Sequence, residues 1–153
     1  MDDLTRLLIE RECLRLMTAY CTHLDRFDVD TFLDLFTPEA TWRRIAPLPV
    51  INQPGRESIR SFFNRRPTHS ESRHLVINPV IDVIDADHAK GVSFGLVVRG
   101  PKGDGTLPVP MRGLELLVEY RDEFVRTPEG WRFAKREMLR LIDVEAKPAD
   151  AKP

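Results

Sequence analysis

The stretch ESRHLVINPVID, residues 71–82, places a titratable histidine where the chain is otherwise building an apolar strand. Side chains alternate between the two faces of a strand, so His74, Val76 and Asn78 share one face. Polar groups among apolar neighbours are typical of a pocket wall. We therefore predict that this face lines a ligand site, with Val76 and Asn78 among the residues that contact the ligand.

The length and composition predict one globular domain. The chain has 153 residues, of which 42% are hydrophobic and 31% charged, and this is enough to bury a core. We assign residues 1–145 to a single domain. The last eight residues, 146–153, are short and polar, and we expect them to form a disordered tail.

Charge and cysteine usage exclude several classes of partner and indicate a compartment. The net charge is −1 and the sequence has no basic block, which argues against nucleic acid and anionic membrane surfaces as partners. No apolar run approaches the roughly 20 residues that span a bilayer. Cys13 and Cys21 are separated by about 12 Å along one predicted helix, beyond disulfide reach. We expect free thiols and a cytoplasmic protein.

Periodicity and turn signals place helices before most of the strands. Such an order is typical of an α+β domain in which helices cover one face of a bent antiparallel sheet and leave a pocket at the open end. The expected helices are 4–24, 31–36 (capped by Asp30) and 56–66, the expected strands are 41–45, 72–85, 89–99, 111–127 and 131–145, and 47–55 is expected to be a proline-rich loop.

Asp25 is the candidate partner of His74. At 100° per residue it lies about 40° from Cys21 and so continues the apolar side of its own helix. A lone buried carboxylate is costly unless it is paired. A histidine on the sheet beneath would be a suitable partner, and the carboxylate would orient the ring as a general base. The alternative is that Asp25 caps a turn in water and that His74 is a core residue bonded to a backbone carbonyl.

Four segments carry a family resemblance: YCTHLDRFDVDTFLDLFTPEATW (20–42), GRESIRSFF (55–63), SRHLVINPVIDV (72–83) and YRDEFVRTPEGWRFAKREM (120–138). Together they resemble the SnoaL-like branch of the nuclear-transport-factor-2-like superfamily. This resemblance implies a cone of strongly bent antiparallel sheet closed by three helices from the N-terminal half of the chain. It is much less specific for activity, because this fold carries both enzymes and binding modules.

The resemblance to scytalone dehydratase, bile-acid 7α-dehydratase and hexachlorocyclohexane dehydrochlorinase implies a catalytic pair. Asp25 and His74 match the aspartate and histidine of these enzymes, and Tyr20 resembles a tyrosine of the bile-acid enzyme. The resemblance implies a lyase or isomerase that needs no cofactor and acts on a small hydrophobic, cyclic molecule. On a straight helix Tyr20 and Asp25 are about 140° apart, so both reach one pocket only if the helix unwinds or the pocket wraps around its end.

Two non-catalytic functions remain open beside this one. The chain could be a ligand-binding module, or a partner of the β-subunit type in a ring-hydroxylating dioxygenase, since residues 120–138 suit such subunits equally well. No histidine pair has metal-ligand spacing such as H-x-H or HExxH, so we expect no metal site.

Further pocket residues are predicted with an alternative for each. Trp42, Phe63 and Tyr120 are candidates for the pocket wall, although aromatic residues beside turns are more often plain core. Arg136 falls on a mainly apolar face, where it could hold a substrate carboxylate or oxyanion. The alternative for Arg136 is an ion pair with Asp122 or with the neighbours of Glu137.

The family resemblance also implies a homo-oligomer, a dimer or trimer formed through the convex face of the sheet. Leu75 and Ile77 are the candidates from one strand. Trp131 and Phe133 alternate on the opposite face from Arg136, which suits either core or oligomer packing.

Overall fold

The computed structural model describes residues 1–66, 70–101, 106, 108–110 and 113–143. The predicted tail, 146–153, lies outside these residues. The elements are α1 (Asp3–Arg26), α2 (Val29–Leu33), β1 (Phe36–Ala46), β2 (Ile51–Pro54), α3 (Gly55–Phe63), β3 (Ser70–Val83), β4 (His88–Pro101), β5 (Gly113–Thr127) and β6 (Gly130–Asp143). No helix in the described part of the chain has the length and apolar composition needed to cross a bilayer.

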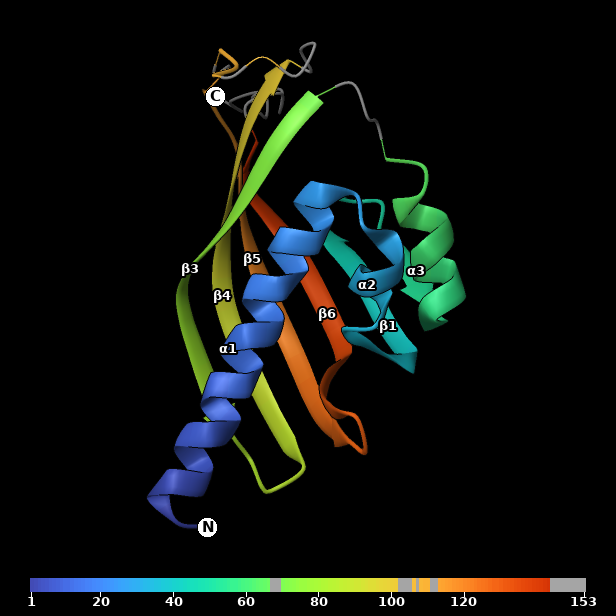
Figure 1. Ribbon diagram of the computed structural model, residues 1–153. Helices are drawn as coiled ribbons and strands as arrows, with labels where there is room; N and C mark the ends of the chain where they lie inside the picture. Colours follow the sequence, from blue (N-terminus) through green and yellow to red (C-terminus); the bar gives the residue numbers. More distant parts are fainter. Residues whose placement is uncertain (67–69, 102–105, 107, 111–112, 144–153) are drawn as a thin grey trace, which may run out of the picture.

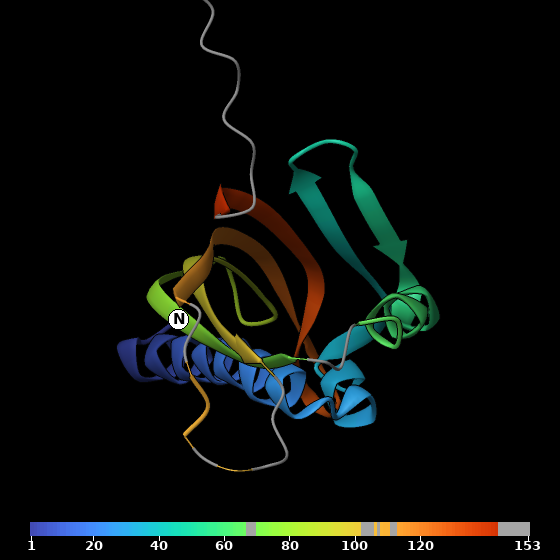
Figure 2. The ribbon, with the colours of Figure 1, turned by 90° about the horizontal axis from the view of Figure 1, so that it is seen from above.

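The strands form a mixed sheet in the order β2-β1-β6-β5-β4-β3. Most neighbours are antiparallel, but β1 runs parallel to β6, a pairing that the strand patterns did not reveal. The helices lie on one side of this sheet, with α1 crossing it in front of β3, β4 and β5 (Figure 1). Seen from above, the sheet is strongly bent and does not close on itself (Figure 2). The predicted α+β class with three helices from the N-terminal half is confirmed.

The helix starts follow their capping residues. Asp2 accepts a hydrogen bond from the backbone N–H of Thr5 at 2.7 Å and begins α1. Asp28, rather than the predicted Asp30, caps α2 by accepting from the N–H of Thr31, so this helix begins two residues before Thr31. Between them Phe27 ends α1 in the left-handed conformation.

The segment 47–55, predicted as a loop, contains a strand. β2 pairs antiparallel with β1, from Arg44 opposite Ile51 to Thr41 opposite Pro54. β2 is an edge strand, so Pro54 can end it without removing a hydrogen bond from a central ladder. The strand predicted over 41–45 is correspondingly longer and begins at Phe36.

β-bulges decide which face several residues occupy. In the β5–β6 ladder Lys135 pairs with Glu123 but Phe133 pairs with Phe124, so Ala134 is an extra residue that reverses the alternation. The prediction that Phe133 and Arg136 lie on opposite faces is therefore wrong. Phe133 is fully buried, and its ring centroid lies 4.3 Å from the Arg136 guanidinium carbon. Phe133 is thus a core residue and does not lie on the convex face.

Gly95 of β4 leaves room for the side chains of Tyr120 and Val118, and replacing it should be costly. An added Cβ would lie 2.6 Å from Cε2 of Tyr120 and 2.9 Å from Cγ2 of Val118. We expect Gly95→Ala to lower the free energy of unfolding by about 1–3 kcal/mol in urea denaturation. Val92→Ala, a change at an exposed position of the same strand, is the control. A Gly95→Ala protein as stable as the wild type would contradict this packing.

Candidate active site

Asp25 and His74 are in direct contact where the last turn of α1 meets β3. Oδ1 of Asp25 lies 2.5 Å from Nδ1 of His74, and Oδ2 accepts the backbone N–H of the same histidine at 2.8 Å. The Ser72 hydroxyl donates to Oδ1 at 3.5 Å. Each of the two ionisable side chains is only 11% exposed. The carboxylate is therefore held by three donors from one strand, instead of ending its helix in water.

The contact fixes the tautomer of His74. An ionised carboxylate only accepts hydrogen bonds, so Nδ1 of the ring carries the proton and Nε2 keeps a free lone pair. The backbone hydrogen bond from His74 to the same carboxylate locks the relative position of the helix and the strand. The ring is thus oriented in the manner of a general base.

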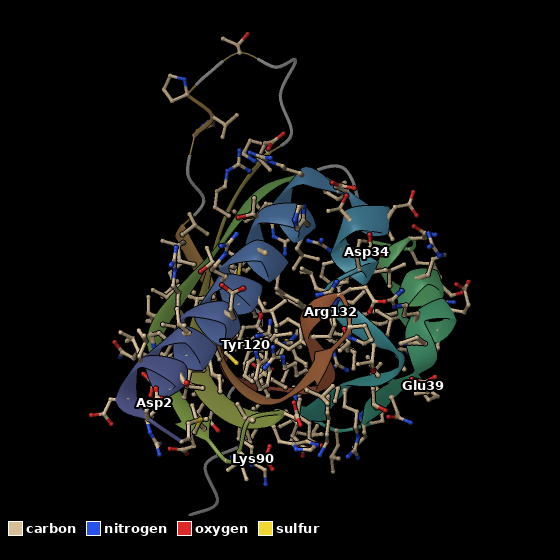
Figure 3. All side chains as sticks on the ribbon, turned by 60° about the horizontal axis from the view of Figure 1, so that its bottom comes forward. Asp2, Asp34, Glu39, Lys90, Tyr120 and Arg132 are labelled. Atoms are coloured by element: carbon tan, nitrogen blue, oxygen red, sulfur yellow. The ribbon has the colours of Figure 1, made fainter. Side chains whose placement is uncertain are left out.

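His74 forms part of the wall of a cavity of about 180 Å³ between the helices and the sheet. The wall is made of aromatic, aliphatic and arginine side chains. Its residues are Tyr20, Leu24, Trp42, Arg44, Phe62, Phe63, Arg66, His74, Val97, Arg99, Leu116, Val118, Tyr120, Met138 and Arg140. Figure 3 shows Tyr120 among the side chains that fill the space between α1 and the sheet, whereas Asp2 and Lys90 lie at the periphery.

Tyr20 reaches the cavity from the C-terminal third of α1. Its hydroxyl oxygen accepts a hydrogen bond from Nε1 of Trp42 at 3.0 Å, which leaves its own proton free to be donated. Burial raises the pKa of Tyr20 to about 12, against the opposing effect of the nearby Arg136 guanidinium. The phenol is therefore neutral near pH 7 and is a hydrogen-bond donor rather than a base.

The helix does not unwind to bring Tyr20 and Asp25 to one site. α1 continues to Arg26, and Tyr20 lines the cavity while Asp25 does not. Asp25 acts on the cavity through His74, which the chain supplies from β3. The angular separation of about 140° on the helix is therefore compatible with one site.

Arg136 lies beneath the cavity rather than in its wall. Nε and Nη2 of its guanidinium donate to the two carboxylate oxygens of Asp122, both at 2.7 Å, and both side chains are fully buried. The ring centroids of Tyr20 and Tyr120 lie 4.0 and 4.3 Å from the guanidinium carbon. Of the two interpretations of Arg136, the structure shows the ion pair with Asp122.

The other predicted contact residues divide into two groups. Trp42, Phe63 and Tyr120 line the cavity. Val76 packs against the hydrophobic core without being part of the cavity wall, and Asn78 is exposed. Asn78 adopts a positive φ of 50° at the register shift that follows Ile77, and this bulge turns its side chain away from the His74 face.

Sequence reasoning missed the arginines of the cavity wall, Arg44, Arg66, Arg99 and Arg140. For two of them, the alternation of side chains along a strand could have predicted a place in the cavity wall. Arg44 follows Trp42 by two residues and Arg140 follows Met138 by two, so each continues the cavity-facing side of its strand. Among the described residues, no group of three or more histidine, cysteine or acidic side chains could hold a metal ion.

Comparison with known proteins decides the family. The sequence profile of the SnoaL-like domain matches residues 5–137. The chain belongs to the SnoaL-like family. No protein with a curated description matches the chain. Among solved structures, this SnoaL-like domain is similar to an NTF2-like protein with a cystatin-like fold from Novosphingobium aromaticivorans. The two are 25% identical over 92% of each chain, with a TM-score of 0.72.

Two further solved structures show the same fold. One is a scytalone-dehydratase-like protein from Novosphingobium aromaticivorans, 21% identical over 97% of this chain and 95% of the other, with a TM-score of 0.75. The second is a hexachlorocyclohexane dehydrochlorinase, 16% identical over 99% of this chain and 98% of the other, also with a TM-score of 0.75. The SnoaL-like domain thus shares its architecture with proteins described as dehydratase-like and dehydrochlorinase.

The buried ion pair beneath the cavity generates a stability prediction. Arg136→Met leaves the Asp122 carboxylate buried without a counter-ion, which should cost about 3–5 kcal/mol of unfolding free energy at neutral pH. Burial raises the pKa of Asp122, and Arg136 opposes this rise. In the variant the folded pKa therefore lies above the unfolded value. The loss of unfolding free energy in Arg136→Met should therefore be smallest at pH values below the pKa of Asp122 in the unfolded chain. It should reach its full size as the pH rises through the pKa of Asp122 in the folded variant.

Urea denaturation across a pH series measures this deficit. The Asp122→Leu/Arg136→Met double variant is the matched control, because it removes both charges, and it should recover much of the lost stability. An Arg136→Met protein with wild-type stability at neutral pH would show that the ion pair does not support the cavity floor.

Proposed function

We propose that this SnoaL-like domain is a cofactor-independent lyase or isomerase of the dehydratase type. The observation that carries the proposal is the contact between Asp25 and Nδ1 of His74, because it leaves Nε2 as the basic nitrogen at a largely apolar cavity. An oriented imidazole of this kind is suited to removing a proton from a carbon or hydroxyl group. The aromatic and aliphatic wall suits a small hydrophobic, cyclic substrate.

The roles of the residues follow from their hydrogen bonds. Nε2 of His74 would take the substrate proton, and the Asp25 carboxylate would stabilise the imidazolium that forms. Tyr20 would donate its free hydroxyl proton to the leaving group or to the developing oxyanion. Trp42 holds the Tyr20 oxygen in place through its indole N–H. The proton taken by His74 would then be returned to the product in an isomerisation or released to solvent in an elimination.

Variants of the dyad test the proposal after a substrate is found by screening hydroxylated and halogenated ring compounds. Loss of the base in His74→Ala should lower kcat by about 10²–10⁴-fold, and Asp25→Asn by about 10²-fold or more, because the wrong tautomer is then favoured. Proton NMR in D₂O follows both turnover and deuterium uptake. A His74→Ala protein that is folded and fully active would contradict the assignment of the base.

The chain supplies a matched control in a second histidine–aspartate contact. Nδ1 of His88, the first residue of β4, lies 3.0 Å from Oδ1 of Asp85 in the preceding turn, and both side chains are more than half exposed. His88→Ala removes the same chemical pair from outside the cavity and should leave kcat unchanged. Ligand affinity that survives Asp25→Asn, in a protein without turnover of any compound in the screen, would favour the binding-module alternative.

We also propose that the domain forms a homo-oligomer through the convex face of its sheet. Leu75 pairs with Leu96, Leu96 with Leu117, and Leu117 with Ile142, so an apolar row crosses four strands. The row alternates with His74 and therefore faces away from the cavity. Leu75 and Ile142 are 46% and 54% exposed in the single chain, which supports their use as contact surface.

Light scattering coupled to size-exclusion chromatography tests the assembly. The wild type should elute with a mass at least twice the 17.6 kDa of one chain, and Leu75→Glu should reduce it to the monomer mass. Leu7→Glu, at an exposed position on α1, is the control and should not change the mass. A wild-type monomer at micromolar concentration would exclude this interface.

A further inference from the structure

Four arginine side chains converge on the same cavity as His74, although they come from distant parts of the chain. Arg44 belongs to β1, Arg66 follows α3, Arg99 belongs to β4 and Arg140 to β6. Like charges repel, so a fold gathers them at one cavity only when something offsets the repulsion. The rest of the wall is largely apolar, so it offers these cations little solvation in place of water.

Strand register places two of these arginines side by side on the sheet. Arg44 pairs directly with Met138 of β6, and Arg140 follows Met138 by two residues on the same face. Arg140 in turn pairs with Val118, which also lines the cavity. The two guanidinium groups are therefore carried by rigid, neighbouring strands rather than by loops.

Two of the four arginines are paired with a carboxylate among the described residues. Nη1 of Arg140 donates to Asp143 at 2.9 Å, and Arg99 forms an ion pair with Glu115. Arg66 has no such carboxylate within the described residues. Its Nη1 donates instead to the carbonyl of Leu24 at 2.9 Å.

Arg44 makes no side-chain hydrogen bond or ion pair of 4 Å or less with the residues that the structure describes. Its Nε is buried and has no hydrogen-bond partner among the residues that the structure describes. Burial lowers the pKa of Arg44, and the charge of Arg140 lowers it further, while the Asp143 carboxylate acts in the opposite direction. A buried donor without a partner is costly, and an acceptor supplied by a ligand would remove that cost.

We propose that the substrate carries a carboxylate, which is held by Arg44 and Arg140 while its apolar ring lies against the aromatic wall beside His74. The proposal deepens the function proposed above and rests on it. A planar guanidinium matches a carboxylate in geometry and gives strong, charge-assisted hydrogen bonds. The same cations would stabilise negative charge that develops when His74 removes a proton close to the carboxylate.

Binding of a matched pair of probes tests the proposal without turnover. 2-Naphthoate and 2-naphthamide have the same ring and nearly the same shape, but only the first is an anion. Isothermal titration calorimetry of the wild-type protein should show that 2-naphthoate binds at least about 10-fold more tightly than the amide. The preference should shrink as salt concentration is raised, because the interaction is between charges.

Substitution of an arginine of the cavity wall tests whether the preference for 2-naphthoate over 2-naphthamide arises in the cavity. Arg44→Met should reduce it to about 3-fold or less, since the stem of the side chain remains but the charge is lost. Arg43→Met is the matched control, because Arg43 occupies the neighbouring position of β1 and pairs with Glu137 at 2.9 Å instead of lining the cavity. Circular dichroism melting curves of both variants verify that they are folded.

The outcomes separate this inference from the proposed function. Equal affinity for the two probes, no saturable binding of 2-naphthoate at millimolar concentration, or an unchanged preference in folded Arg44→Met would overturn the carboxylate site. Turnover of a neutral ring compound that depends on His74 would leave the proposed function standing in any of these cases. Conversely, a carboxylate preference that persists in His74→Ala supports the anion site even if His74 proves to have no catalytic role.

Discussion

The buried pair of Asp122 and Arg136 is the interaction around which the core is arranged. Two hydrogen bonds of 2.7 Å join the side chains across the β5–β6 ladder, where the two residues are direct partners. A register slip of one residue would separate them and leave two uncompensated charges in the core. The guanidinium is covered by the rings of Tyr20, Tyr120 and Phe133, and the two tyrosines also line the cavity. The pair therefore specifies both the register of the sheet and the floor of the site.

The contact between α1 and β3 shows the same principle at the edge of the cavity. Asp25 accepts hydrogen bonds from the ring and the backbone of His74, so one carboxylate both docks the helix and orients the imidazole. The docking of the helix and the orientation of the ring cannot be changed independently, because they use the two oxygen atoms of one carboxylate. A contact that docks the helix at the pocket wall in this way also holds the imidazole ring in one position.

The cavity combines two chemical characters. Most of its lining residues are aromatic or aliphatic and suit an apolar ring, while arginines from four separate segments contribute positive charge to the same wall. His74 and these arginines line one small cavity of about 180 Å³. Negative charge that develops on a substrate when a proton is removed would therefore be close to the guanidinium groups, which would stabilise it.

Local sequence determined the class of fold, the long helix and the strands β3 to β6, because hydrophobic periodicity and turn residues act over a few positions. The pairing of Asp25 with His74 was predicted from an ionisable residue on an apolar helix side together with the family resemblance. Tertiary structure alone decided the parallel β1–β6 pairing and the bulge at Ala134, which determines the face of Arg136. It also gathered arginines that are far apart in the chain at one cavity. These features depend on contacts between distant segments, and a single bulge reverses every later side chain, so residue patterns do not encode them locally.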